Sequence, residues 1–388
     1  MQKKQYAKLE VLADNVFDKY DSLSGVGISE ELDIDEIYDD SLKMLDELAQ
    51  NITVKEKIDL EGWKALPMLA EAASIAGLGI LNKELFGVYL DGVRHLIKKV
   101  VEKGEEEGII EDYGEIISKT DVLILVPLKE EINEFVNIFY CDDSYHRVGT
   151  AKLYFSTINN VNITIIQPKY MGQTDATAAA SMILEKAKPK YVIIAGIAAG
   201  FDKGDQNLGD VLIPDSILHY DRIRKVKDGS EGGIITDSNA DIYKSSLSLV
   251  QSLDDFYNKS PLYKMWKIDN QKKINSVQDF SEIPNVLIGE TLASADEVQA
   301  SEAVIKKLTS FNRKLIGQDM ESAGVHVASN YYDNECDIVT IRGISDWGAN
   351  KEDLEEDTGG KIRKYAARRC ASFIKSYLNS DQFKEIIA

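Results

Sequence analysis

Cysteine is scarce in this sequence. Cys141, Cys336 and Cys370 lie far apart, with no CxxC pair and no histidine at ligand spacing, so a disulfide scaffold is excluded and a structural zinc site is not expected. Long apolar runs are also missing, because the longest, residues 72–82, is far shorter than the roughly 20 residues that a bilayer span needs. The polar, helical pattern at the N-terminus is unlike a signal peptide. We therefore expect a soluble protein of a reducing compartment, most simply the cytoplasm.

Basic residues are outnumbered in this chain, with 45 Lys and Arg against 65 Asp and Glu and a net charge of −20. A balance this acidic argues against general binding to nucleic acid or to an anionic membrane surface. Hydrophobic residues make up 44% of the 388 residues, so most of the chain is expected to bury a core. That length predicts two domains rather than one.

The two parts of the chain differ in pattern. Residues 1–118 carry apolar residues near helical spacing and end in a charged stretch punctuated by glycine, which is typical of a linker. We expect a helical regulatory or assembly domain there. Residues 119–388 alternate β-branched apolar runs, such as DVLILVP, YVIIAGIAAG, DVLIPDSIL and DIVTIRGISD, with helical segments such as KEEINEFVNIF and KIRKYAARRCASFIKSYL. This alternation predicts an α/β domain with a largely parallel central sheet.

Three carboxylates follow separate apolar runs: Glu131, Glu321 and Asp346. Each alone is more often a helix cap or a surface ion-pair partner, but functional residues of parallel sheets gather where strands end. Together they suit cleavage of a glycosidic bond, in which an acid protonates the leaving group and a base activates water around a cationic transition state. Met320, beside Glu321, either packs against a sugar face or fills the core.

The glycine segment AGIAAG matches neither a Walker loop nor a dinucleotide-binding loop. Its spacing alone favours close packing of a strand against a helix. Glycine also lets a backbone approach a ligand closely, so Gly196 and Ala198 are candidate substrate-binding residues.

Four segments in chain order carry a family resemblance over residues 121–378: VPLKEEINEF, AGIAAGFDKGDQNLGDVLIPDSILHYD, IGETLASADEVQA, and IGQDMESAGV with IRGISDW. They resemble the nucleoside phosphorylase/nucleosidase superfamily, in particular its methylthioadenosine/S-adenosylhomocysteine nucleosidase branch. The last pair is similar to that branch's EMEA and RAISD motifs in order and spacing. The resemblance implies a central mixed, largely parallel sheet flanked by helices, and residues 1–118 lie outside it as an appended helical domain.

The resemblance also implies roles for individual residues. Glu131 matches the glutamate that positions the attacking water, and Asp346 matches the aspartate that protonates the purine at N7. Ser345 precedes that aspartate in the same motif and would orient it. Glu321 matches the residue that hydrogen-bonds the ribose hydroxyls, and Met320 matches the one that lies against the ribose.

Two positions depart from the family. Val298 falls near the place where an aromatic residue often stacks on the base, and Trp347 replaces a small residue. These two departures leave undecided which base the site prefers and what its side pocket accepts. No metal or cofactor is expected.

The nucleophile is expected to be water rather than phosphate. Phosphorylases of the superfamily grip phosphate with arginine and serine, but the matching positions here are Glu131, Ile194 and Ile197. A phosphate dianion would meet a carboxylate and two aliphatic side chains, which is electrostatically unfavourable.

A basic segment follows one of the expected strands and contains Arg222, Arg224, Lys225 and Lys227. These side chains suit the oxygens of a 5′-phosphate. A solvated basic loop that pairs with the acidic N-terminal domain is an alternative of nearly equal weight.

The sequence thus predicts a purine nucleosidase that hydrolyses a nucleoside or a 5′-nucleotide such as ATP or AMP, with a regulated role in antiviral defence as a further hypothesis. The alternatives are a housekeeping methylthioadenosine/S-adenosylhomocysteine nucleosidase, a purine nucleoside phosphorylase, and a nucleoside-sensing domain, against which the intact acid and base argue. The resemblance implies a homo-oligomer that pairs through the α/β domain. A regulatory partner would bind residues 1–118.

Overall fold

The computed structural model describes residues 113–141, 145–201, 204–228, 234–272, 277, 280–297, 302–332, 336–348 and 360–387. Residues 1–112 lie outside this part of the chain, so the helical domain expected over residues 1–118 stays a prediction, as does its boundary. No helix among the described residues is both long and apolar enough to pass through a bilayer.

The helices are α5 (Tyr113–Ser118), α6 (Lys129–Phe139), α7 (Gln173–Ala187), α8 (Leu247–Lys259), α9 (Pro261–Asp269), α10 (Glu302–Phe311), α11 (Ser322–Asn330), α13 (Lys361–Leu378) and α14 (Asp381–Ile387). The strands are β1 (Val122–Leu125), β2 (His146–Val148), β3 (Ala151–Ile158), β4 (Val161–Gln167), β5 (Tyr191–Gly200), β6 (Val211–Ile213), β7 (Ser216–Asp228), β8 (Ile234–Lys244), β9 (Val286–Ile288), β10 (Thr291–Ser294), β11 (Leu315–Asp319) and β12 (Asp337–Asp346).

The strands form one sheet in the order β2-β3-β4-β1-β5-β11-β10-β7-β8, with β12 paired to β5 and β6, and β9 paired to β6. The pairs β1–β4, β1–β5, β5–β12, β10–β11, β10–β7 and β6–β9 are parallel. The pairs β3–β4, β5–β11, β6–β12 and β7–β8 are antiparallel. The expected mixed, largely parallel sheet is therefore confirmed.

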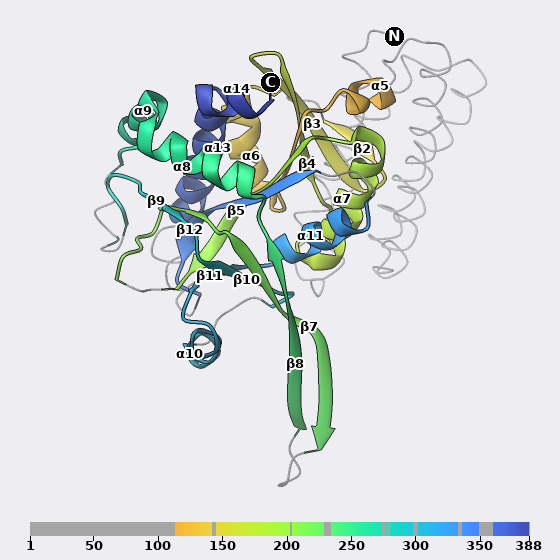
Figure 1. The fold of residues 1–388 in the computed structure, drawn as a ribbon, viewed down its shortest axis with the longest axis vertical. Helices are drawn as coiled ribbons and strands as arrows, with labels where there is room; N and C mark the ends of the chain where they lie inside the picture. The colour runs from red at the N-terminus through yellow and green to blue at the C-terminus, as the bar shows by residue number, and fades with distance from the viewer. Residues whose placement is uncertain are drawn as a thin grey trace, which may run out of the picture. The chain divides into compact units, whose positions relative to one another are not determined.

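Helices cover the central strands and explain why those strands are continuously apolar. Every residue of β1 is buried, as expected for a parallel strand covered on both faces. Helix α6 buries Ile132, Phe135 and Phe139 and packs against α13, which also packs against β5 and β12. Helix α7 packs against α11, and both helix pairs can be followed in Figure 1.

One expected strand is two strands in the structure. The run at residues 210–218 is interrupted at Pro214, which lacks the N–H that a continuous ladder needs, so β6 ends before it and β7 begins after it. Strand β7 then continues through the basic segment to Asp228, so that segment is a strand rather than a loop. Figure 1 shows β7 and β8 running side by side away from the other strands.

Candidate active site

Glu131 is held at the start of α6 by two backbone groups. The N–H of Leu128 donates to its Oε2 at 3.1 Å, and the N–H of Ile197 in β5 donates to its Oε1 at 2.9 Å. The residue is 2% exposed. Burial raises the pKa of Glu131 to about 7, helped by the charge of Glu321 and opposed by Arg342. A carboxyl that titrates near neutral pH suits a general base.

Glu321 lies at the N-terminus of α11, two residues after the end of β11. Its Oε1 accepts a hydrogen bond from the N–H of Gly172 at 3.0 Å, and its Oε2 lies 3.2 Å from Nη2 of Arg342. Burial raises the pKa of Glu321 to about 7, with Asp319 raising it further and Arg342 lowering it. Two carboxyl groups of this site therefore exchange protons in the neutral range.

Arg342 of β12 lies between Asp319 and Glu321, and no role for it was expected from the sequence. Its Nη2 lies 2.6 Å from Oδ2 of Asp319 as well as near Glu321, and its Nη1 donates to the carbonyl oxygen of Ala195 at 3.0 Å. The side chain is fully buried. A charged residue inside a buried strand segment, IVTIRGI, was the available signal, because such a residue needs a buried counter-ion.

Asp319 was also missed, although it stands two residues before Glu321 at the end of β11. It accepts hydrogen bonds from Ser294 Oγ at 2.6 Å, from the N–H of Ser322 and from Ser322 Oγ. With Arg342 on its other side, this carboxylate fixes the guanidinium in place.

The cluster of Glu131, Asp319, Glu321 and Arg342 carries more potential negative than positive charge. Burial alone would lower the pKa of Arg342, but Asp319, then Glu321 and Glu131, raise it above its ordinary value. The arginine therefore stays charged, while burial favours the neutral form of Glu131 and Glu321 by raising their pKa values.

Gly196 allows the close approach of two of these side chains. Its φ is +137°, and a Cβ at this position would lie 2.6 Å from Nη1 of Arg342 and 2.8 Å from Oε2 of Glu131. Gly196 and Ala198 are buried, whereas Ile197 and Ala199 are partly exposed. The glycine segment therefore leaves space for Arg342 and Glu131 at Gly196 and bonds Glu131 through Ile197.

Asp346 ends β12 beside the same segment of β5. A register shift between Ile344 and Asp346 places Asp346 opposite Ala199. Its Oδ2 accepts from Ser345 Oγ at 2.7 Å, and its Oδ1 accepts from the N–H of Gly348 at 2.8 Å. Ser345 is thus in position to orient Asp346, while the proton-donor role of Asp346 stays a prediction.

Three more residues were predicted to bind substrate: Met320, Trp347 and Val298. Met320 is partly exposed beside Glu321. Trp347 packs against a cluster of buried hydrophobic residues. A Cβ added at Gly200 would lie 2.8 Å from its ring. Val298 lies outside the described residues.

Arg222 lies on β7, and its side chain contacts two residues of β8. Its Nη1 contacts Oδ2 of Asp241 and donates to Oη of Tyr243 at 2.7 Å. No contact joins Arg222 to the Glu131–Arg342 cluster within the described part of the chain. The side chain of Arg224 lies outside that description. Binding of a 5′-phosphate by these residues stays a prediction.

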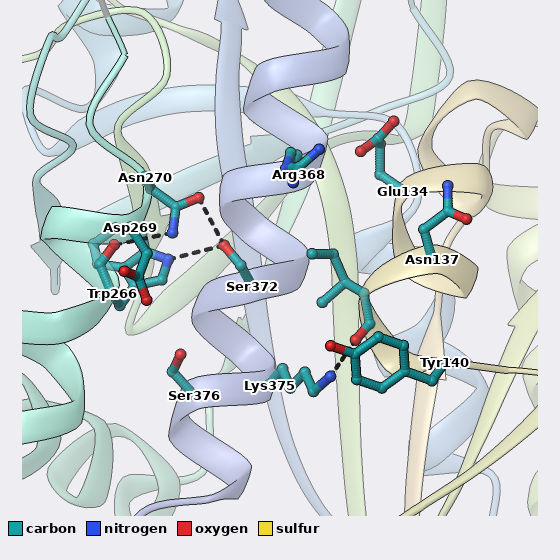
Figure 2. Close-up of a pocket in the computed structure, with 11 residues that line it drawn as sticks. Glu134, Asn137, Tyr140, Trp266, Asp269, Asn270, Arg368, Ser372, Lys375 and Ser376 are labelled. Atoms are coloured by element: carbon teal, nitrogen blue, oxygen red, sulfur yellow. Dashed lines mark hydrogen bonds between the residues drawn. The ribbon is translucent and has the colours of Figure 1, made fainter.

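A separate groove of about 370 Å³ lies between α6, α9 and α13 (Figure 2). Lys375 reaches across it to the carbonyl oxygen of Ile138, and Ser372 accepts from the indole N–H of Trp266 at 3.0 Å. None of the predicted site residues lines this groove. Across the described residues, no group of three or more His, Cys, Asp or Glu side chains is arranged to hold a metal ion.

Comparisons with known proteins agree with this fold. An ATP nucleosidase, Cap17, from Escherichia coli is 24% identical over 254 residues, which cover 62% of this chain and 48% of Cap17. A 5′-methylthioadenosine/S-adenosylhomocysteine nucleosidase from a Geobacillus species is 24% identical over 234 residues, covering 60% of this chain and 88% of the relative.

Among solved structures, the Helicobacter pylori 5′-methylthioadenosine/S-adenosyl homocysteine nucleosidase aligns with a TM-score of 0.51 at 19% identity, over 68% of this chain and 99% of that one. This likeness shows a shared fold. The alignment with Cap17 spans about half the length of that relative. The family model of the Phosphorylase superfamily matches residues 121–379, about two thirds of the chain, and the chain therefore belongs to the Phosphorylase superfamily.

Proposed function

We propose that residues 119–388 form a purine nucleosidase, which hydrolyses the N-glycosidic bond of a nucleoside or 5′-nucleotide and releases the free base. The observation that carries the proposal is the placement of Glu131 and Asp346 along one segment of β5, with Glu131 bonded to Ile197 and Asp346 opposite Ala199. The relatives named above are nucleosidases, which supports the same class of reaction.

The proposed reaction uses these residues in four roles. Ionised Glu131 takes a proton from water, whose oxygen forms the new bond to C1′ of the sugar. The C1′–N9 bond breaks, and Asp346 donates a proton to N7 so that the base leaves neutral. Glu321 hydrogen-bonds the ribose hydroxyls, and Met320 lies against the sugar.

Water is the proposed nucleophile because the site offers phosphate little positive charge. Arg342 is already shared between Asp319 and Glu321, and the carboxyl of Glu131 also lies beside it at Gly196. A phosphate dianion beside this cluster would face more negative than positive charge. A phosphorylase is therefore the less favoured alternative.

The substrate proposed is a 5′-nucleotide, with ATP and AMP as the first candidates. The name of the Escherichia coli relative, an ATP nucleosidase, supports this choice, as do Arg222 and Arg224 on β7. Destruction of such a nucleotide would suit a regulated effector in defence, with residues 1–118 as the regulatory or assembly domain in a homo-oligomer. A housekeeping methylthioadenosine/S-adenosylhomocysteine nucleosidase is the alternative.

Chromatography of a nucleoside and nucleotide panel, incubated with the protein with and without phosphate, tests the reaction class. Free base together with unphosphorylated C1′ is expected in both conditions, and ribose 1-phosphate would overturn the hydrolase. Asp346→Asn and Glu131→Gln should each lower turnover by about 10²–10⁴-fold. Glu134→Gln, which changes a buried glutamate on the same helix, is the matched control.

Rates on ATP, AMP, adenosine and methylthioadenosine test the substrate. If Arg222 binds phosphate, Arg222→Ala should raise KM for nucleotides and leave nucleosides little changed. Asp241→Asn should do the opposite for nucleotides, because it frees the guanidinium. A clear preference for methylthioadenosine would favour the housekeeping alternative.

A further inference from the structure

Gln318 is a buried residue of β11 to which neither the motifs nor the mechanism gives a role. Its side chain is almost entirely buried, with the residue 4% exposed. The Nε2 atom donates to the carbonyl oxygen of Glu297 at 2.9 Å. Since that carbonyl can only accept, the amide must turn its oxygen the other way. This oxygen, Oε1, is buried and meets no hydrogen-bond partner in the described part of the chain.

The sheet register places Gln318 in a row with the proposed acid. Gln318 pairs with Ala199 of β5, and Ala199 pairs with Asp346 of β12. Gln318 and Asp346 therefore lie on the two strands that flank Ala199, with a register shift just before Asp346. Two strand spacings separate the two backbones by about 10 Å. Ala199 between them is small and partly exposed.

Buried polar side-chain atoms in folded proteins nearly always have a hydrogen-bond partner. A buried acceptor that lacks a hydrogen-bond partner among the described residues, two strands away from the proposed acid Asp346, is therefore suited to a donor supplied by the substrate. We propose that Gln318 is a base-specificity residue whose amide oxygen accepts a hydrogen bond from the exocyclic amino group of the base that Asp346 protonates. This inference rests on the function proposed above.

The two ends of the row match one edge of a 6-aminopurine. That edge presents N7, an acceptor, next to the 6-amino group, a donor. A protonated Asp346 would donate to N7, and Oε1 of Gln318 would accept from the amino group. A 6-oxopurine presents two acceptors on the same edge, so its carbonyl oxygen would face the oxygen of Gln318. The site is therefore expected to prefer adenine-type over hypoxanthine-type substrates.

Paired substrates that differ only at the 6-position test this inference in the full-length protein. The kcat/KM of the wild type should be higher for AMP and ATP than for IMP and ITP. Gln318→Met keeps the length of the side chain but removes the acceptor. It should lower kcat/KM for the amino substrates by roughly 10- to 100-fold, in line with a lost buried hydrogen bond, and leave the oxo substrates little changed.

Gln206 provides the matched control. It is 5% exposed, its Nε2 donates to the carbonyl oxygen of Ile316 at 2.9 Å, and its Oε1 is likewise buried with no partner among the residues described. That oxygen, however, lies beside Gly200 next to the buried side chain of Ile344. Gln206→Met should therefore leave the ratio of amino to oxo substrates unchanged.

Calorimetric titration with free adenine and free hypoxanthine gives a second readout that needs no turnover. Tighter binding of adenine by the wild type, lost in Gln318→Met but kept in Gln206→Met, is the expected result. An equal effect of Gln318→Met on both bases, or no preference in the wild type, would overturn the role of Gln318. Absence of cleavage for every substrate would refute the proposed nucleosidase, and the titration with free bases would still decide the role of Gln318.

Discussion

Replacement of Arg342 by methionine should cost the domain much of its stability. The guanidinium lies 2.6 Å from Asp319 and 3.2 Å from Glu321, and each attraction is worth about 5–6 kcal/mol at an effective dielectric constant of about 20. Methionine removes this gain, but it also removes the cost of burying the arginine. Loss of one partner from a buried ion pair typically costs about 3–5 kcal/mol, which we expect for Arg342→Met at pH 8.

The loss should depend on pH. Arg342 lowers the pKa values of Glu131 and Glu321, which burial raises to about 7. Without the arginine, both values rise further above the unfolded value of about 4.3. The folded variant then binds more protons than the unfolded chain over a wider range, so its stability falls more steeply as the pH rises. The difference from the wild type should be largest at pH 8 and smaller at pH 5.

Denaturant unfolding at pH 5 and pH 8, with equal m-values as a check, measures this difference. Arg369→Met is the control. Arg369 is also buried, but its guanidinium donates to backbone carbonyl oxygens, including those of Asn270 and Ser281. Its loss should destabilise the domain similarly at both pH values. A cost below about 1 kcal/mol for Arg342→Met at pH 8, or a cost independent of pH, would refute the shared-charge description of the site.

Three further predictions concern the same site. Gly196→Ala should lower both thermal stability and turnover, because the added Cβ would meet Arg342 and Glu131 and the residue has a positive φ. Gly289→Ala is the control: its φ is +101° but no atom of the described residues lies near the added Cβ, so thermal unfolding should show the cost of backbone strain alone. In a pH–rate profile, activity should rise as the pH passes about 7 and Glu131 ionises, and Glu321→Gln should move that inflection to lower pH because the charge of Glu321 raises the pKa of Glu131. Ser345→Ala should lower kcat by roughly 3- to 10-fold with little change in KM, in line with one lost hydrogen bond to Asp346, and an unchanged kcat would remove its orienting role.

The parts of the fold that were predictable are those whose signal is local. Strand β1 and helix α6 could be read from the sequence because burial on both faces gives a continuous apolar run, and burial on one face gives a helical stripe. Strand β8 could not, because its segment IITDSNADIYK contains turn-forming residues and becomes a strand through pairing with β7.

The residues of the site also differ in whether their signal in the sequence is local. Glu131, Glu321 and Asp346 follow separate apolar runs, and the ends of strands can be anticipated from such runs. The partnership of Asp319 with Arg342 could not be, because it joins two strands that are not adjacent in the sheet and depends on their relative placement. A buried charge in an apolar strand signals that a partner exists without saying which residue it is.

At Gly196, the absence of a side chain permits both the close packing of the strands and the position of the carboxyl proposed to activate water. The missing side chain of Gly196 lets Glu131 from the start of α6 and Arg342 from β12 reach the same position of β5. The next N–H, from Ile197, then fixes the carboxyl of Glu131. A shift of β12 by one residue against β5 would turn Arg342 to the opposite face. Substitutions that loosen this pairing should therefore impair turnover before they unfold the domain.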